Sequence, residues 1–135
     1  MIDQKTPFIP ISWGELFDKI TILEIKKKKI RTQNSLDNVE KELMLLTRVK
    51  NSLLEMDNQL NCMIDQLSLI NIGLWDIEDR LREKESLQEF DEIFIDLARS
   101  VYIENDRRAE IKKQINEFLG SELKEEKSYT DYIKP

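Results

Sequence analysis

Histidine is absent from this 135-residue chain, and only one cysteine, three glycines and three prolines occur in it. Without histidine the chain lacks the commonest general base and the commonest transition-metal ligand of proteins. The single cysteine, Cys62, excludes a disulfide within the chain, and its apolar neighbours predict a buried or half-buried, unreactive thiol. Any catalysis would therefore depend on carboxylates, Lys, Arg, Tyr or a bound magnesium ion.

Long apolar runs are also missing. No segment approaches the ~20 consecutive apolar residues that cross a bilayer, and the N-terminus lacks the basic-then-apolar order of a secretion signal. We therefore expect a cytoplasmic protein with no membrane span. The net charge of −6 repels phosphate backbones, so nucleic acid is not an expected partner.

Charged and apolar residues are what the chain has in quantity. Charged residues make up 36% and hydrophobic residues 40%, a balance that suits long amphipathic helices and gives strands little support. Ser12 and Glu15 form a capping box, which predicts the start of a helix over 13–33. Ser35 is a suitable N-cap for a second helix.

The strongest pattern follows Ser35. Apolar residues recur at alternating spacings of three and four from Leu36 to Leu81, which predicts a helix over 36–84. Asp57 is the weak point of this run, so the pattern leaves open a kink near 57.

A last helix is predicted over 88–119, and Gly120 is a suitable residue to end it. The short link before this helix makes it run antiparallel to the preceding one. We predict an all-α fold, a long antiparallel helical hairpin or bundle of three or four helices with coiled-coil-like packing. Residues 1–120 form one domain, and residues 121–135 form a loosely ordered tail.

Polar residues interrupt the apolar seam of the last predicted helix. Asn105 and Arg108 occupy positions where the three-four spacing calls for apolar side chains. Antiparallel pairing about the predicted turn puts Arg108 near Asp65, and Arg99 near Glu78. A buried arginine needs a charged partner, so pairing with these acids is expected where the positions are enclosed. The first interpretation is structural, because a polar residue in such a seam often fixes the register of the helices.

A second interpretation is a small polar pocket for an anionic small molecule, such as a sugar phosphate or a nucleotide sugar. The candidate ligand-binding residues are Arg99, Tyr102, Asn105, Arg108 and Lys112, with Trp75 and Glu78 on the preceding helix. This interpretation assigns no catalytic residue, no cofactor and no metal ligand.

A third interpretation uses the carboxylates around Asp76, Glu78 and Asp79 to bind Mg²⁺. All-helical nucleotide pyrophosphohydrolases use carboxylates on facing helices in this way. Arg80 and Arg82 lie among these acids and satisfy them locally, which argues against the metal.

Several motifs of the chain are similar to those of one family. They lie at Ile11–Lys26, Leu74–Asp79, Leu97–Tyr102, Asn105–Lys112 and Gly120–Tyr129. Together they resemble the uncharacterised bacterial and phage family called domain of unknown function 6165 (DUF6165), over nearly the whole chain. The resemblance implies an all-helical protein of no established activity, whose relatives accompany genes for glycosyl transfer and surface-polysaccharide assembly. It offers no catalytic residues.

The first functional prediction is a non-enzymatic helical interaction protein. We expect it to form homo-oligomers, to accept a protein partner and to act as an accessory in glycan assembly, because an extended hairpin exposes more apolar seam than one helix can cover. One alternative is a ligand-binding domain or enzyme for a sugar phosphate or nucleotide sugar. The other is a magnesium-dependent nucleotide pyrophosphohydrolase.

Overall fold

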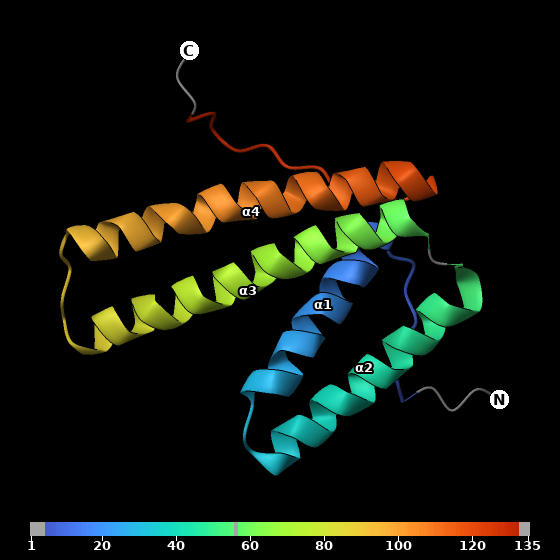
Figure 1. Ribbon diagram of the computed structural model, residues 1–135, viewed down its shortest axis with the longest axis horizontal. Helices are drawn as coiled ribbons and strands as arrows, with labels where there is room; N and C mark the ends of the chain where they lie inside the picture. Colours follow the sequence, from blue (N-terminus) through green and yellow to red (C-terminus); the bar gives the residue numbers. More distant parts are fainter. Residues whose placement is uncertain (1–4, 56, 133–135) are drawn as a thin grey trace.

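The computed structural model describes residues 5–55 and 57–132. Within these residues the chain forms four helices and no strand (Figure 1). The helices are α1 (Trp13–Lys29), α2 (Gln33–Leu53), α3 (Asn58–Ser86) and α4 (Glu92–Leu119). The predicted all-α fold is confirmed, with four helices.

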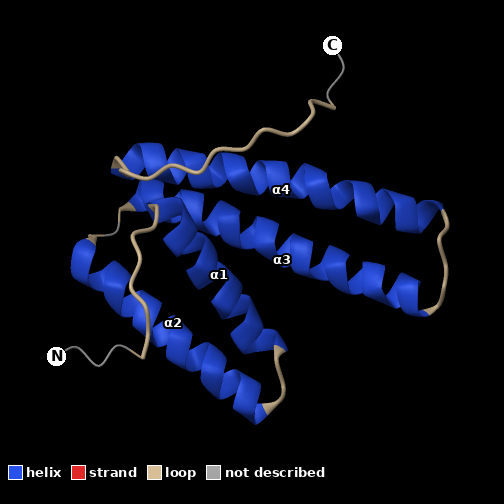
Figure 2. Ribbon diagram, turned by 180° about the vertical axis from the view of Figure 1, so that it is seen from behind, coloured by secondary structure: helices blue, strands red, loops and turns tan. Residues whose placement is uncertain are grey.

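Two helical hairpins make up the molecule. α3 and α4 lie side by side in opposite directions, as the sequence predicts, and α1 and α2 form a second, shorter hairpin (Figures 1 and 2). α1 packs against each of the other helices, whereas α2 packs only against α1 among the described helices. The far ends of α3 and α4, where the turn joins them, project beyond α1 and α2 (Figure 1).

The segment predicted as one helix over 36–84 is divided in two. α2 ends at Leu53, and Asp57 caps α3 because its Oδ1 accepts a hydrogen bond from the backbone N–H of Leu60 at 2.8 Å. An aspartate that caps a new helix favours an interruption over a continuous helix. The sequence left open a kink near Asp57, and the structure has a complete interruption of the helix there. This interruption lets α2 lie along α1.

The hydrophobic core lies where α1 meets the hairpin of α3 and α4. Phe17, Leu60, Leu67 and Ile115 are almost completely buried there, and Met63 joins them. The predicted seam residues Leu67 and Leu74 are buried. Cys62 lies outside this face and is exposed, so the prediction of a buried thiol was wrong. It directly precedes Met63, and one step along a helix turns a side chain by about 100° away from the buried face.

Gly14 permits the close approach of α1 to α4. A Cβ atom at this position would lie 2.6 Å from the backbone oxygen of Lys112, so no larger residue fits without a backbone shift. The N–H of Gly14 donates to Oδ1 of Asn116 at 2.6 Å. This contact brings the first turns of α1 against the last turns of α4.

The C-terminal segment after Gly120 runs back along α4 (Figure 2). Ser121 is buried and accepts a hydrogen bond from the N–H of Trp13 at 3.3 Å. Further along, Tyr132 donates to Asp106, and its ring lies edge-on to that of Tyr102. Residues 121–132 therefore make defined contacts with the helices, although they contain no helix themselves.

Candidate functional site

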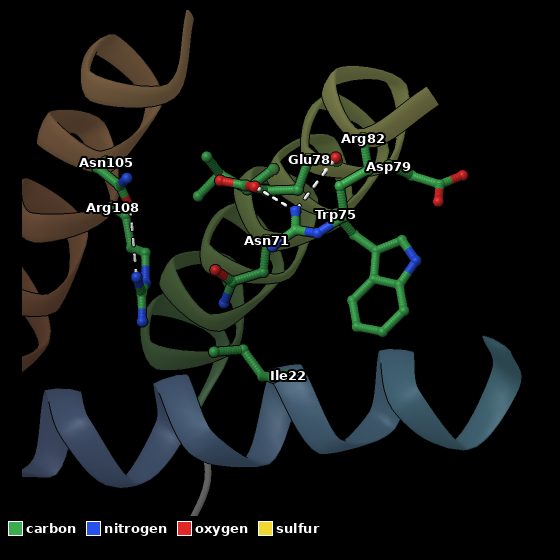
Figure 3. A pocket seen from close by; sticks show the side chains of 9 residues that line it. Ile22, Asn71, Trp75, Glu78, Asp79, Arg82, Asn105 and Arg108 are labelled. Atoms are coloured by element: carbon green, nitrogen blue, oxygen red, sulfur yellow. Dashed lines mark hydrogen bonds and ion pairs between the residues drawn. The ribbon is translucent and has the colours of Figure 1, made fainter. Parts of the chain in front are cut away.

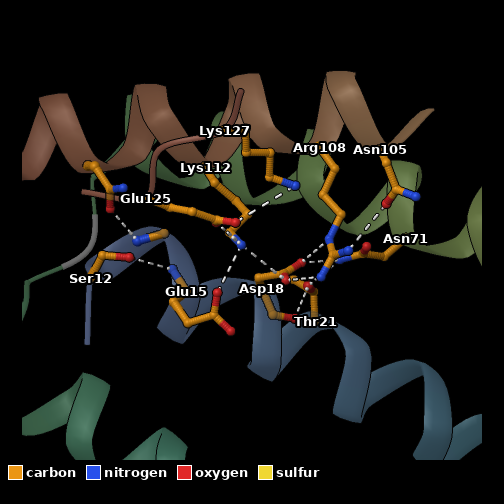
Figure 4. Close-up of polar contacts among 12 residues, drawn as sticks. Ser12, Glu15, Asp18, Thr21, Asn71, Asn105, Arg108, Lys112, Glu125 and Lys127 are labelled. Atoms are coloured by element: carbon orange, nitrogen blue, oxygen red, sulfur yellow. Dashed lines mark hydrogen bonds and ion pairs between the residues drawn. The ribbon is translucent and has the colours of Figure 1, made fainter. Parts of the chain in front are cut away.

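Asp18 of α1 is the centre of a buried polar cluster between α1, α3 and α4 (Figure 4). Its side chain is only 1% exposed. Oδ1 accepts hydrogen bonds from Nδ2 of Asn71 and from Nε of Arg108, each at 2.9 Å. The second carboxylate oxygen accepts from a terminal nitrogen of Arg108. The guanidinium thus binds the carboxylate through two parallel hydrogen bonds, the strongest geometry for such a pair.

Lys112 extends this cluster toward the ends of α1 and of the chain. Its Nζ donates to Glu15 at 2.9 Å and to Glu125 at 2.8 Å, and it lies 3.7 Å from Asp18. Glu15 belongs to the first turn of α1, and Glu125 to the C-terminal segment. One buried lysine therefore joins α4, α1 and the C-terminal segment through three carboxylates.

The electrostatics favour the charged forms of Asp18 and Lys112. Burial alone raises the pKa of Asp18, but hydrogen bonds from Arg108 and Asn71 and the nearby positive charges outweigh it and hold the pKa below 3.8. Burial likewise lowers the pKa of Lys112, and its hydrogen bonds to Glu125 and Glu15 outweigh that effect, so the pKa ends above 10.5. Throughout the described residues, every fully buried polar side-chain atom has a hydrogen-bond partner. The cluster is a complete ion network that fixes three helices together.

A cleft of about 540 Å³ opens beside this network, between α1, α3 and α4 (Figure 3). We call it the central cleft. It is lined by Ile22, Asn71, Leu74, Trp75, Glu78, Asp79, Arg82, Asn105 and Arg108. Its volume lies within the range of about 300–1,000 Å³ that is usual for small-molecule sites.

Four of the seven predicted ligand-binding residues meet in the central cleft. They are Trp75 and Glu78 from α3 and Asn105 and Arg108 from α4. Figure 3 shows Asn105 and Arg108 on one side of Ile22 and the indole of Trp75 on the other.

A model of the family of unknown function DUF6165 matches residues 8–135. The chain belongs to this family. No curated protein and no solved structure matches it. The matched range includes the whole Asp18 cluster and the whole central cleft of this chain.

The other predicted residues of this DUF6165 chain lie elsewhere. Arg99 is exposed, and its Nε donates to the hydroxyl of Tyr102 at 3.4 Å. Tyr102 lines a second cleft, of about 590 Å³, between α4 and the C-terminal segment. Lys112 is enclosed in the ion network and faces its own three carboxylates. The seven residues therefore do not form one pocket.

The predicted partners of the two arginines were wrong. Arg108 pairs with Asp18 and not with Asp65, because α1 inserts against the hairpin and brings a carboxylate that the two-helix alignment did not include. Glu78 pairs with Arg82 on its own helix, at 2.6 Å, and not with Arg99. An i,i+4 neighbour on the same helix is closer than a residue on the facing helix.

Sequence reasoning missed the residues that hold the network together. These are Asp18, Thr21, Asn71, Glu15 and Glu125. One signal was available, since Asp18 and Thr21 stand among apolar residues on a helix that is buried on several sides. A carboxylate at such a position requires a cation from another element.

Two features are absent from the described residues, 5–55 and 57–132. No group of three or more Cys, Asp or Glu side chains is placed to hold a metal ion. No helix combines the length and the apolar character needed to cross a membrane.

Proposed function

We propose that this DUF6165 chain is a non-enzymatic helical interaction protein that associates with further copies of itself. The proposal rests on the solvent-accessible surface of the chain, which is 10,314 Å². A compact monomer of 16.1 kDa exposes about 7,400 Å². The difference of about 2,900 Å² per chain exceeds the roughly 800 Å² that each partner buries in a standard protein interface. Such an open arrangement of two hairpins suits a protein that acts by contact.

The turn between α3 and α4 supplies the best interaction surface. Leu87, Phe90 and Ile93 are 65%, 53% and 51% exposed, and we call them the tip patch. Lys84 holds the turn in one shape because its Nζ binds Glu89 and Asp91, each at 2.9 Å. A surface that is already ordered loses less entropy when it binds.

Charge points to a second copy of the chain as the partner. The segment 83–96 around the tip patch has six carboxylates and one lysine, a net charge of −5. The segment 26–31, at the turn between α1 and α2, has four lysines and one arginine, a net charge of +5. Opposite charges of this size steer association and select the orientation. The tip of one copy therefore docks at the α1–α2 turn of the next, a head-to-tail contact that builds chains or closed rings.

Sedimentation velocity at micromolar concentration tests this proposal. We expect species larger than a monomer, whose size falls as salt rises, because screening shortens the Debye length from about 10 Å at 0.1 M to about 3 Å at 1 M. Leu87→Gln should weaken association. Leu69→Gln is the matched control, since Leu69 is 69% exposed on α3 away from the tip and should leave association unchanged. A strict monomer at low salt, or equal effects of the two variants, contradicts the proposal.

Charge reversal gives a sharper test of the orientation. Glu85→Lys with Glu92→Lys reduces the charge of the tip segment from −5 to about −1, and Lys28→Glu with Lys29→Glu reduces that of the turn segment from +5 to about +1, so each double variant alone should associate much more weakly than the native chain. Their equimolar mixture retains one unmodified tip and one unmodified turn. It should therefore form a 1:1 complex and grow no further. A mixture that stays monomeric contradicts the head-to-tail contact.

The accessory role in glycan assembly, which the family resemblance implies, belongs to the same proposal. Co-purification of the tagged chain with a glycosyltransferase encoded in its own genome tests it. A Leu87→Gln variant that still captures the enzyme would assign that contact to another surface. The absence of any co-purifying glycosyltransferase contradicts the accessory role.

A further inference from the structure

We propose that the central cleft binds an uncharged ring that carries neighbouring hydroxyl groups, such as one monosaccharide unit. This inference is independent of self-association, because the cleft lies at the junction of α1, α3 and α4 and the tip patch lies at the α3–α4 turn. It also revises the anionic ligand that the sequence suggested. The reasons are the charge balance of the cleft, its apolar side and its unused polar atoms.

The charge balance does not favour an anion. Two arginines and two carboxylates line the cleft, which gives it no net charge. Arg108 is bound to Asp18, and Arg82 is bound to Glu78. An incoming phosphate would meet guanidinium groups whose charge these carboxylates already neutralise, and it would be repelled by the carboxylates and by Asp79. An uncharged ligand meets neither obstacle, since it leaves both ion pairs intact.

One side of the cleft is apolar. It is formed by Ile22, Leu74 and the half-buried indole of Trp75. An aromatic ring packs well against the C–H groups of a flat saturated ring, and the burial of both surfaces favours binding. This contact gives affinity without demanding charge.

Hydrogen-bond donors remain unused on the α4 side. The guanidinium of Arg108 has five N–H groups, of which hydrogen bonds to Asp18 and Asn105 take three. The other two have no acceptor within the described part of the chain, and 28% of the side chain is exposed. Asn105 accepts from Arg108 through Oδ1, so its Nδ2 is also available to a ligand.

Acceptors are available on the α3 side. Asn71 donates through Nδ2 to both Asp18 and Thr21, which leaves its Oδ1 at the cleft to accept. The carboxylates of Glu78 and Asp79 add further acceptors. A hydroxyl group both donates and accepts, so adjacent hydroxyls on one ring can satisfy the two sides of the cleft at once.

The ion network also prepares the cleft for binding. Arg108 and Asn71 are held by Asp18, a carboxylate that is itself almost completely buried. Their polar atoms are therefore in place before a ligand arrives, which reduces the cost of ordering them.

Fluorine NMR on protein labelled with 5-fluorotryptophan tests the proposal. The chain has two tryptophans, and Trp13, which stacks on Phe17 in the core, serves as an internal reference. We expect glucose, galactose, mannose or N-acetylglucosamine to shift the Trp75 resonance saturably in the millimolar range and to leave the Trp13 resonance in place. The variant Trp75→Phe assigns the two signals.

Substitutions in the cleft and measurements with anions distinguish an uncharged ligand from an anionic one. Asn105→Leu removes a hydrogen bond, and Glu78→Gln replaces a charged acceptor with a weaker neutral one, so each should weaken binding about tenfold, whereas Glu83→Gln, on α3 outside the cleft, should have no effect. Inorganic phosphate should leave the Trp75 resonance unchanged, and glucose 6-phosphate should bind no more tightly than glucose. If Asn105→Leu does not fold, Glu78→Gln decides the test, because Glu78 pairs only within α3.

Three results would overturn the proposal. The first is that none of the four sugars shifts the Trp75 resonance. The second is that phosphate alone shifts it as strongly as a sugar, which would make the cleft an anion site. The third is that Glu78→Gln and Glu83→Gln weaken sugar binding equally. Sugar binding that persists in Leu87→Gln would separate this site from self-association.

Discussion

Replacing Arg108 by methionine tests how the fold is held together. The change leaves the carboxylate of Asp18 at 1% exposure without its bidentate partner. Removing one member of a buried ion pair costs about 3–5 kcal/mol. Asp18 would keep the hydrogen bond from Asn71 and a lysine nitrogen 3.7 Å away, so we expect the lower end, about 3 kcal/mol of unfolding free energy.

The reciprocal variant, Asp18→Asn, should cost less. The side chain of Arg108 is 28% exposed, so its guanidinium can turn toward water when the carboxylate is gone. The introduced amide retains an oxygen that can accept from Arg108, and we expect a loss of about 1–2 kcal/mol. The two expected losses of stability differ because the two side chains differ in burial. Only the aspartate has no route to solvent.

The pH dependence of the unfolding free energy provides a second test of the ion pair between Asp18 and Arg108. In the native chain the pKa of Asp18 is held below 3.8, so its stabilising contribution is present above that value and is lost as pH falls through the lowered pKa. In Arg108→Met the hydrogen bonds and the positive charge of Arg108 are gone, so we expect burial, the largest single effect on this carboxyl, to raise its pKa above the unfolded value. Protonation then favours the folded variant, and the stability gap to the native chain should narrow as pH falls from 7 toward 4.

Urea unfolding followed by circular dichroism measures these differences. With a slope of about 2 kcal/mol/M, a loss of about 3 kcal/mol lowers the midpoint by about 1.5 M. Both variants belong in the Leu87→Gln background, so that association does not contribute to the apparent stability. The reasoning is refuted if Arg108→Met costs less than Asp18→Asn, or if its stability gap widens in acid.

Further predictions concern single positions. In thermal unfolding, Gly14→Ala should destabilise the chain by about 1–3 kcal/mol, because the added Cβ meets a backbone carbonyl of α4. Gly73→Ala, with open space around it, should stabilise the chain by about 0.5–1 kcal/mol. The opposite order of stability would contradict the close approach of α1 to α4. The hydrogen bond to Asp106 raises the pKa of Tyr132 to about 12, so this tyrosine should ionise last in an ultraviolet titration, and Asp106→Asn should abolish the delay. Cys62 should react with a thiol reagent in the folded state at a rate close to that in urea, and strong protection would contradict its exposure.

The hairpin was predictable from the sequence because its information is local and periodic. Residues from Leu60 to Leu81 repeat at spacings of three and four, and this rhythm fixes which face of α3 meets α4. A short link then decides the antiparallel direction. The same rhythm continues through Asp57, so it could not show that this residue caps a new helix.

The partner of Arg108 was not predictable from that pattern. Asp18 is 90 positions away in sequence and lies on a helix outside the aligned pair. Periodicity describes one face of a helix and says nothing about a third helix that packs across it. The close approach that brings Asp18 to Arg108 depends on Gly14, whose role appears only when the backbone of α4 is in place.

The structural and ligand-binding interpretations of the polar seam do not compete at Arg108. Three N–H groups of its guanidinium hold Asp18 and Asn105, and the remaining two are available to the central cleft. A lysine at this position would keep the charge but lose the planar bidentate contact and the second set of donors. One side chain therefore fixes α1 against α4 and supplies donors to the cleft. The cleft therefore shares Arg108 and Asn71 with the buried ion network that docks α1 onto the hairpin of α3 and α4.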